Sequence, residues 1–195
     1  MRIGIDIDGV FTDLRQFHID YGSKYCYENN IDFSYDLSYF DIASTFNITK
    51  DLEKDFWNKY LEFYAREEKI RPFAKEIIDK LKEDGNEIYI ITARWLADRE
   101  DEIGENMRNI TKNWLYENDI KYDKLIFTKS SKLQYCIDNK IDLMIEDDSK
   151  NINELSTKVP VICYDAEYNR NCKGNNIIRC YSWYDVYIKI NQQFK

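Results

Sequence analysis

The first dozen residues of the chain constrain its fold most strongly. A short apolar run from Ile3 to Ile7 predicts a buried strand, and it delivers two carboxylates, Asp6 and Asp8, at the end of that strand. Because side chains alternate along a strand, both carboxylates lie on one face and the isoleucines lie on the other. Two like charges this close repel unless a cation lies between them. A divalent ion with oxygen ligands, typically Mg²⁺, is therefore expected at this strand end.

The rest of the chain from residue 71 onward alternates between strand and helix patterns. Short apolar runs predict strands over 87–92, 124–128, 141–145, 159–164 and 177–180. Apolar residues at helical spacing predict helices between these strands. This alternation is typical of an α/β protein with a mostly parallel sheet and helices on both faces. Ligands of such sheets bind beyond the carboxyl ends of the strands.

Two helix starts in this part are marked by polar residues. A long helix is expected to begin at Ala97 or Asp98, and Ser130 or Ser131 is expected to cap the helix that extends to about residue 139.

The segment 14–70 interrupts this pattern early in the chain. Aromatic residues recur at helical spacing over 14–29, and Thr49 is a good N-cap for a second aromatic helix. The sequence therefore predicts a helical block of residues 14–70 placed after the first strand of an α/β core of residues 1–13 and 71–195. Most aromatic residues of this block are expected to pack together. His18, the only histidine, is interpreted as a packing or surface residue of the block.

Composition excludes several classes of partner. The net charge of −8 argues against binding a nucleic-acid polymer, which usually needs a basic surface. No apolar run approaches the length of a membrane span, and the N-terminus lacks a signal-peptide layout. The five cysteines form no metal-binding pattern, so we expect free thiols in a reducing, cytoplasmic compartment. Cys172, in a polar stretch, is the one expected to be exposed.

Reactive side chains follow two further strands. Thr92 ends one predicted strand, and the acidic run 146–148 ends another. A lysine, Lys129 or Lys132, lies between them near the start of a helix. If these strands are parallel neighbours, their ends converge on Asp6 and Asp8. Two arginines near strand ends, Arg94 and Arg170, could touch a phosphate or a base, but we expect solvent exposure for each.

The ordered motifs resemble those of the haloacid dehalogenase superfamily. They run from Asp6-Ile-Asp8-Gly-Val-Phe-Thr-Asp13 through Ile-Ile-Thr92-Ala-Arg and a helix-start lysine to Ile-Glu-Asp147-Asp148. The layout is further similar to the cytosolic 5′-nucleotidases and deoxyribonucleotidases, in size, in the position of the helical block and in the Tyr-Ser-Trp segment near the C-terminus. Val10 stands where the superfamily commonly has threonine. The resemblance implies a Rossmann-like fold and Mg²⁺-dependent phosphohydrolase activity. It also implies that residues 14–70 form a small helical cap inserted after the first motif, and one or two of the cap aromatics could stack on a nucleobase.

The resemblance also implies catalytic roles. Asp6 would be the nucleophile that forms an aspartyl-phosphate, and Asp8 would be the general acid and then the general base. Thr92 would hydrogen-bond a phosphoryl oxygen, and Lys132 would neutralise the charge of the phosphate. Lys132 is preferred over Lys129 because it lies in the first turn of the helix and can reach past its end.

A metal-ligand set is implied in the same way. Asp6, the backbone carbonyl of Asp8, and Asp147 would bind Mg²⁺, and Asp148 or Glu146 would act through water. The acidic run leaves the choice between Asp147 and Asp148 as the direct ligand open.

The leading hypothesis is a phosphomonoesterase acting on a small-molecule phosphate ester, a nucleoside (deoxy)5′-monophosphate. The alternatives are a sugar-phosphate phosphatase or phosphomutase of the same superfamily, and a non-catalytic binding member. The sequence leaves the base, the sugar and a homodimeric state open.

Overall fold

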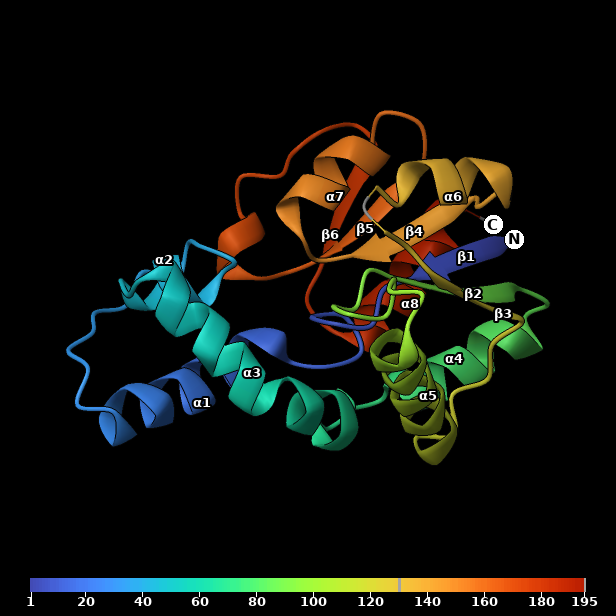
Figure 1. Ribbon diagram of the computed structural model, residues 1–195. Helices are drawn as coiled ribbons and strands as arrows, with labels where there is room; N and C mark the ends of the chain where they lie inside the picture. Colours follow the sequence, from blue (N-terminus) through green and yellow to red (C-terminus); the bar gives the residue numbers. More distant parts are fainter. Residues whose placement is uncertain (130, 195) are drawn as a thin grey trace.

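The structure, a computed structural model that describes residues 1–129 and 131–194, contains a six-stranded sheet (Figure 1). The strands are β1 (Arg2–Ile5), β2 (Glu87–Thr92), β3 (Lys124–Phe127), β4 (Leu143–Glu146), β5 (Val161–Tyr164) and β6 (Ile177–Cys180). Their order is β3-β2-β1-β4-β5-β6, and every neighbouring pair is parallel. The predicted α/β fold class, with a Rossmann-like parallel sheet, is confirmed.

Helices cover both faces of the sheet. On one face, apolar residues of α4 (Ala74–Glu83), α5 (Glu102–Glu117) and α8 (Trp183–Gln193) join the larger core cluster. On the other face, α6 (Leu133–Asp138) and α7 (Ser149–Leu155) pack on residues such as Met144 and Cys163. Alternate residues of β2, β4 and β5 belong to the two clusters, as the two-residue repeat of a strand requires.

The segment after β1 folds into α1 (Leu14–Glu28), α2 (Ile42–Phe46) and α3 (Lys50–Glu67), the block at one side of the sheet in Figure 1. These helices share an aromatic core of their own, which includes Phe17, Tyr25, Phe46, Phe56 and Tyr64. The Thr49 hydroxyl accepts a hydrogen bond from the Leu52 N–H at 3.3 Å, which is the predicted N-cap.

The chain leaves and re-enters the α/β part at one place. Thr12 forms an antiparallel bridge with Ile70, and the Arg71 N–H donates to the Phe11 carbonyl at 2.6 Å. The Arg71 guanidinium also donates to the Thr12 carbonyl at 2.9 Å and to the Asp13 carboxylate at 3.0 Å. These contacts join the two connections of the helical block directly to the loop that follows β1.

Two local expectations were wrong, and a third is not met at the candidate that the structure describes. Helix α5 begins at Glu102, because Asp101 provides the N-cap and accepts from the Gly104 N–H at 3.1 Å. Cys172 is buried, since the polar loop around it folds back onto the second core cluster. The N-cap residue of α6 is Lys132 and not Ser131, although the Ser131 hydroxyl accepts from the Leu133 N–H at 3.2 Å; Ser130 lies outside the described residues. Among the described residues, no helix has the length and apolar character needed to cross a bilayer.

Candidate active site

The predicted site residues lie at the topological switch point of the sheet. Strand β1 lies between β2 and β4, and the strand order reverses direction there. Open parallel sheets bind ligands at this position, beyond the carboxyl ends of the strands. Asp6 and Asp8 follow β1, Thr92 ends β2, and the acidic run 146–148 begins at the end of β4. The topology thus brings these three strand ends together.

The loop after β1 is shaped by a glycine. Gly9 has a φ of +86°, a backbone conformation that L side chains rarely adopt. A Cβ at this position would lie 1.9 Å from Oδ2 of Asp147, so only glycine fits against that carboxylate. The Thr12 hydroxyl accepts from the Gly9 N–H at 3.3 Å and lies 2.7 Å from the hydroxyl of Tyr64 on α3. The loop is therefore tied to the helical block as well as to the sheet.

Three buried carboxylates and one lysine form the centre of the site. Candidate ligand oxygens of Asp6, Glu146 and Asp147 all lie within 4.8 Å of one another. Lys132 is 1% exposed, and its Nζ lies 2.8 Å from Asp6 Oδ1 and 2.6 Å from Glu146 Oε2. Burial acts to lower the pKa of Lys132, but the two carboxylates hold it above its ordinary value. Burial raises the pKa of Asp6 to about 8, even though Lys132 opposes this shift.

Of the three carboxylates, only that of Glu146 has hydrogen-bond partners within the described chain on both of its oxygens. Glu146 accepts from Lys132 through Oε2, and its Oε1 accepts from the N–H groups of Asp147 and Asp148 at 3.2 and 3.1 Å. In contrast, Oδ1 of Asp147 is buried and has no hydrogen-bond partner among the described residues. Burial raises the pKa of Asp147 well above its ordinary value. One lysine cannot balance three carboxylates, so this donor set fits a divalent cation bound through Asp6 and Asp147.

Asp148 and Lys129, the alternatives to Asp147 and Lys132, both have partners away from the carboxylate cluster. Asp148 caps α7, where its carboxylate accepts from the Asn151 N–H at 2.9 Å. Lys129 is exposed and forms an ion pair with Glu100 at 3.2 Å, whereas Lys132 is the N-cap residue of α6 and lies inside the site. Thr92 is fully buried, and its hydroxyl accepts from the Arg94 N–H at 3.2 Å.

Arg94 was expected in solvent, and this expectation was wrong. Its side chain is buried, because its guanidinium pairs with the carboxylate of Asp8 through two nitrogens. The Nε···Oδ2 distance is 3.2 Å, and Nη2 contacts Oδ1. Nη1 has no hydrogen-bond partner in the described part of the chain. Arg170 does remain exposed, near Glu167 at 3.8 Å.

A cavity of about 400 Å³ opens beside Asp8, between the strand ends and the helical block. Aromatic rings of Phe40, Trp57 and Trp95 line it, together with His18 and Arg94. The His18 imidazole is 2% exposed and packs edge-on to Trp57, with ring centroids 5.5 Å apart, which agrees with the packing interpretation. Neither ring nitrogen has a hydrogen-bond partner among residues 1–129 and 131–194. Burial lowers the pKa of His18 to about 3, so the ring is neutral at physiological pH.

The sequence of the chain matches the family described as 5′ nucleotidase, deoxy (pyrimidine), cytosolic type C protein, over residues 1–194. The chain belongs to this nucleotidase family. A nucleotidase of Clostridium acetobutylicum is 32% identical over 197 residues, which cover 100% of this chain and 96% of that protein. The resemblance to the cytosolic 5′-nucleotidases and deoxyribonucleotidases is thereby confirmed, and the protein is a phosphoric monoester hydrolase.

Solved structures show the same fold at low sequence identity. A haloacid dehalogenase-like hydrolase of Streptococcus pneumoniae has a TM-score of 0.61 and 12% identity, with 100% of this chain and 98% of that chain covered. The D,D-heptose bisphosphate phosphatase of B. bronchiseptica, complexed with magnesium and phosphate, has a TM-score of 0.57 and 9% identity, with 98% of each chain covered.

Proposed function

We propose that this nucleotidase-family member is a Mg²⁺-dependent phosphomonoesterase that hydrolyses nucleoside (deoxy)5′-monophosphates through an aspartyl-phosphate on Asp6. The observation that carries the proposal is the buried cluster of Asp6, Lys132 and Asp147 beside an aromatic cavity. The cluster supplies a nucleophile and positive charge for a phosphoryl group, and the cavity supplies flat apolar surfaces for a base. Phosphoryl transfer depends mainly on such positioning and charge neutralisation.

The chain's own residues account for both chemical steps. A carboxylate oxygen of Asp6 attacks phosphorus, the ester P–O bond breaks, and Asp8 gives a proton to the leaving oxygen. Asp8 then takes a proton from the water that attacks phosphorus, which releases inorganic phosphate and restores the Asp6 carboxylate. Thr92 hydrogen-bonds a phosphoryl oxygen, and Lys132 neutralises charge on the phosphoryl group. When bound by Asp6, Asp147 and the Asp8 carbonyl, Mg²⁺ would supply further neutralisation of the phosphoryl charge.

Arg94 has a place in this scheme that the sequence did not indicate. Its two contacts to Asp8 fix the direction of that carboxylate at the edge of the cavity. A carboxyl group held in one direction can, when protonated, deliver its proton to the leaving oxygen without a search over rotamers. We therefore assign Arg94 as the residue that orients the general acid.

Residues 14–70 act as a cap on a core of residues 1–13 and 71–195 in this proposal. The cap contributes His18, Phe40 and Trp57 to the cavity, whereas Arg94 and Trp95 come from the core. Closure of the cap would exclude water from the phosphoryl group, and its rings would stack on the nucleobase. All five cysteines are free and buried, which supports action on a small-molecule substrate in a reducing compartment such as the cytoplasm.

The test is phosphate release from a panel of nucleoside monophosphates, sugar phosphates and an aryl phosphate, with and without Mg²⁺. We expect nucleotides to rank first, and we expect Asp6→Asn to lower kcat by at least about 10³-fold because it removes the nucleophile. Lys132→Met should lower kcat strongly, whereas the matched variant Lys129→Met should not. Full activity of Asp6→Asn, with deamidation excluded by mass spectrometry, would contradict the proposal, and isomer interconversion without net phosphate release would indicate a phosphomutase.

A further inference from the structure

Tyr168 lies between the helical cap and the carboxylate cluster. It belongs to a short 3-10 turn (Glu167–Asn169) after β5, and its hydroxyl donates a hydrogen bond to Oδ2 of Asp147. The face of its ring contacts the cap: the guanidinium carbon of Arg15 lies 4.8 Å from the ring centroid. Phe40, also from the cap, meets the same ring edge-on at 5.1 Å. A single side chain thus contacts both the cap and a candidate metal ligand.

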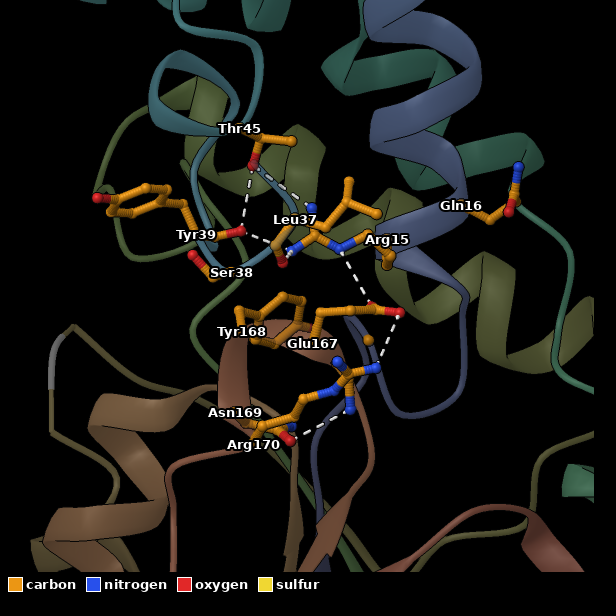
Figure 2. A network of polar contacts seen from close by, with 12 residues as sticks. Arg15, Gln16, Leu37, Ser38, Tyr39, Thr45, Glu167, Tyr168, Asn169 and Arg170 are labelled. Carbon is orange, nitrogen blue, oxygen red and sulfur yellow. Dashed lines mark hydrogen bonds and ion pairs between the residues drawn. The ribbon is translucent and has the colours of Figure 1, made fainter. Parts of the chain in front are cut away.

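Arg15 contacts several segments of the cap as well as the turn that carries Tyr168, as Figure 2 shows. It extends from α1, is buried, and its Nη2 donates to the carbonyls of Leu37 and Tyr39 at 2.9 and 2.5 Å. Its Nη1 lies 3.4 Å from the Thr45 hydroxyl, and its Nε lies 3.9 Å from the Glu167 carboxylate. Arg15 therefore holds the loop before α2 and the core turn that carries Tyr168 at the same time.

The turn is also fixed to the backbone of the metal site. The side-chain amide of Asn169 donates to the carbonyls of Asp147 and Tyr164, at 2.8 Å each. With Oδ2 of Asp147 engaged by Tyr168, Oδ1 is the oxygen left without a partner among the described residues. The hydroxyl of Tyr168 thus occupies Oδ2 and leaves Oδ1 of Asp147 available to a cation. Outer partners of this kind hold ligands in the orientation that a metal requires.

We propose that Tyr168 is a positioning residue that presents Asp147 to the divalent cation, and that its contact with Arg15 couples cation binding to closure of the cap. The inference rests on the proposed function, because it takes Asp147 as a metal ligand. Coupling between two sites is reciprocal. A bound cation therefore favours the closed cap, and a closed cap raises affinity for the cation. Cation binding and cap closure are therefore coupled before the substrate binds.

The first experiment measures binding of Mn²⁺ alone, as a spectroscopic substitute for Mg²⁺, to the full chain by electron paramagnetic resonance. Tyr168→Phe removes only the hydroxyl and keeps the ring that contacts Arg15 and Phe40. We expect it to raise the dissociation constant of Mn²⁺ by about 10- to 100-fold. The matched control is Tyr184→Phe, which removes another tyrosine hydroxyl bonded to a carboxylate, that of Glu76, on the surface. The control should bind Mn²⁺ as the wild type does.

The second experiment measures hydrogen exchange of the cap segment 31–41 with and without Mn²⁺. In the wild type we expect the cation to slow exchange of this segment at least about threefold, because the closed cap is favoured. Tyr168→Leu lacks both the hydroxyl and the ring, so saturating Mn²⁺ should leave its exchange unchanged. Circular dichroism and the Tm in EDTA verify that each variant is folded. If Tyr168→Leu does not fold, Tyr168→Phe alone still tests the proposal that Tyr168 presents Asp147 to the cation.

The outcomes separate this inference from the proposed function. The inference is overturned if Tyr168→Phe binds Mn²⁺ with unchanged affinity, or if Mn²⁺ slows hydrogen exchange of the cap segment equally in the wild type and in Tyr168→Leu. The metal assignment stays intact in either case if the wild type binds Mn²⁺ and Asp147→Asn does not. If Asp147→Asn binds Mn²⁺ as tightly as the wild type, the metal assignment itself fails, and the inference fails with it.

Discussion

Lys132 brings one positive charge into a site with three buried carboxylates. Its ammonium group is shared between Asp6 and Glu146, at 2.8 and 2.6 Å. Removal of one partner from a buried ion pair typically costs about 3–5 kcal/mol, because the other charge is left uncompensated. Loss of the lysine would therefore destabilise the folded site, and in the proposed reaction the same lysine neutralises charge on the phosphoryl group. At the residue scale, structure and chemistry depend on the same contact.

The pKa of His18 gives the first prediction at this scale. Its folded pKa is about 3, below the ordinary value of 6.5, because burial disfavours the charged ring. Between these two values the unfolded chain binds one more proton than the native chain, so stability falls as pH falls, by at most roughly 1.4 kcal/mol per pH unit. We expect the ring C–H resonances of this single histidine to be constant from pH 8 to pH 5. The chain unfolded in urea is the control, with an ordinary midpoint, and a midpoint near 6.5 in the native protein would contradict the assignment.

Gly9 and Gly85 form a matched pair for a second prediction. Both have positive φ, +86° and +83°, but a Cβ on Gly85 would meet nothing within 4 Å, whereas one on Gly9 would meet Asp147. Gly85→Ala should cost about 1–2 kcal/mol of stability in urea unfolding, and Gly9→Ala should cost more because its Cβ would also clash with the Asp147 carboxylate. Only Gly9→Ala should also displace the Asp147 carboxylate, and we expect it to raise the Mg²⁺ concentration required for phosphate release by roughly 10-fold or more. A wild-type Mg²⁺ requirement in Gly9→Ala would show that Asp147 is not a ligand.

Some site residues were predictable from the sequence because local pattern decides their position. Asp6, Thr92 and Asp147 each follow an apolar run, and parallel strands bring such ends to one edge. Arg94 and Tyr168 were missed for a physical reason. Arg94 is buried only because Asp8, 86 residues earlier, pairs with it, and Tyr168 lies in a polar loop with no periodic pattern. Contacts between distant polar residues leave no local signal.

At the scale of elements, α3 connects the aromatic core of the helical block with the cavity. One side of the helix packs Phe56, Tyr60 and Tyr64 into that aromatic core, while Trp57 lines the cavity. The helix could be predicted because its N-cap and its apolar spacing agree. The sequence could not predict which aromatic residues of α3 would reach a ligand, since that depends on where α3 lies relative to β2 and the loop that follows it.

Trp57 and Phe63 on α3 allow a controlled test of the cap's role. Trp57→Ala should lower kcat/KM for nucleoside monophosphates by about 10- to 100-fold, because stacking on one base is worth about 1–3 kcal/mol. It should change kcat/KM for ribose 5-phosphate little, since that substrate has no base to stack. Phe63→Ala, on an exposed part of the same helix outside the cavity lining, is the control. An equal loss for both substrates in Trp57→Ala would contradict a stacking role.

At the scale of the whole molecule, the site lies where two parts of the chain meet. The sheet places carboxylates and lysine at its switch point, and the helical block places aromatic rings over them. The block connects through the segment that follows Asp8 and through Arg71, which holds both connections together. We therefore expect a motion of the block to displace the loop of Asp8 and, through Tyr168, the carboxylate of Asp147.

The central claim is that Asp6 carries the phosphoryl group. The direct measurement uses Asp8→Asn with p-nitrophenyl phosphate, whose leaving group needs no proton, so that the first step proceeds and the second, which needs a base, stalls. Acid quench, borohydride reduction and peptide mass spectrometry then locate the acyl phosphate. We predict a burst of about one p-nitrophenolate per active site and conversion of Asp6 to homoserine. Steady turnover without a burst, or reduction at another residue, would contradict the account.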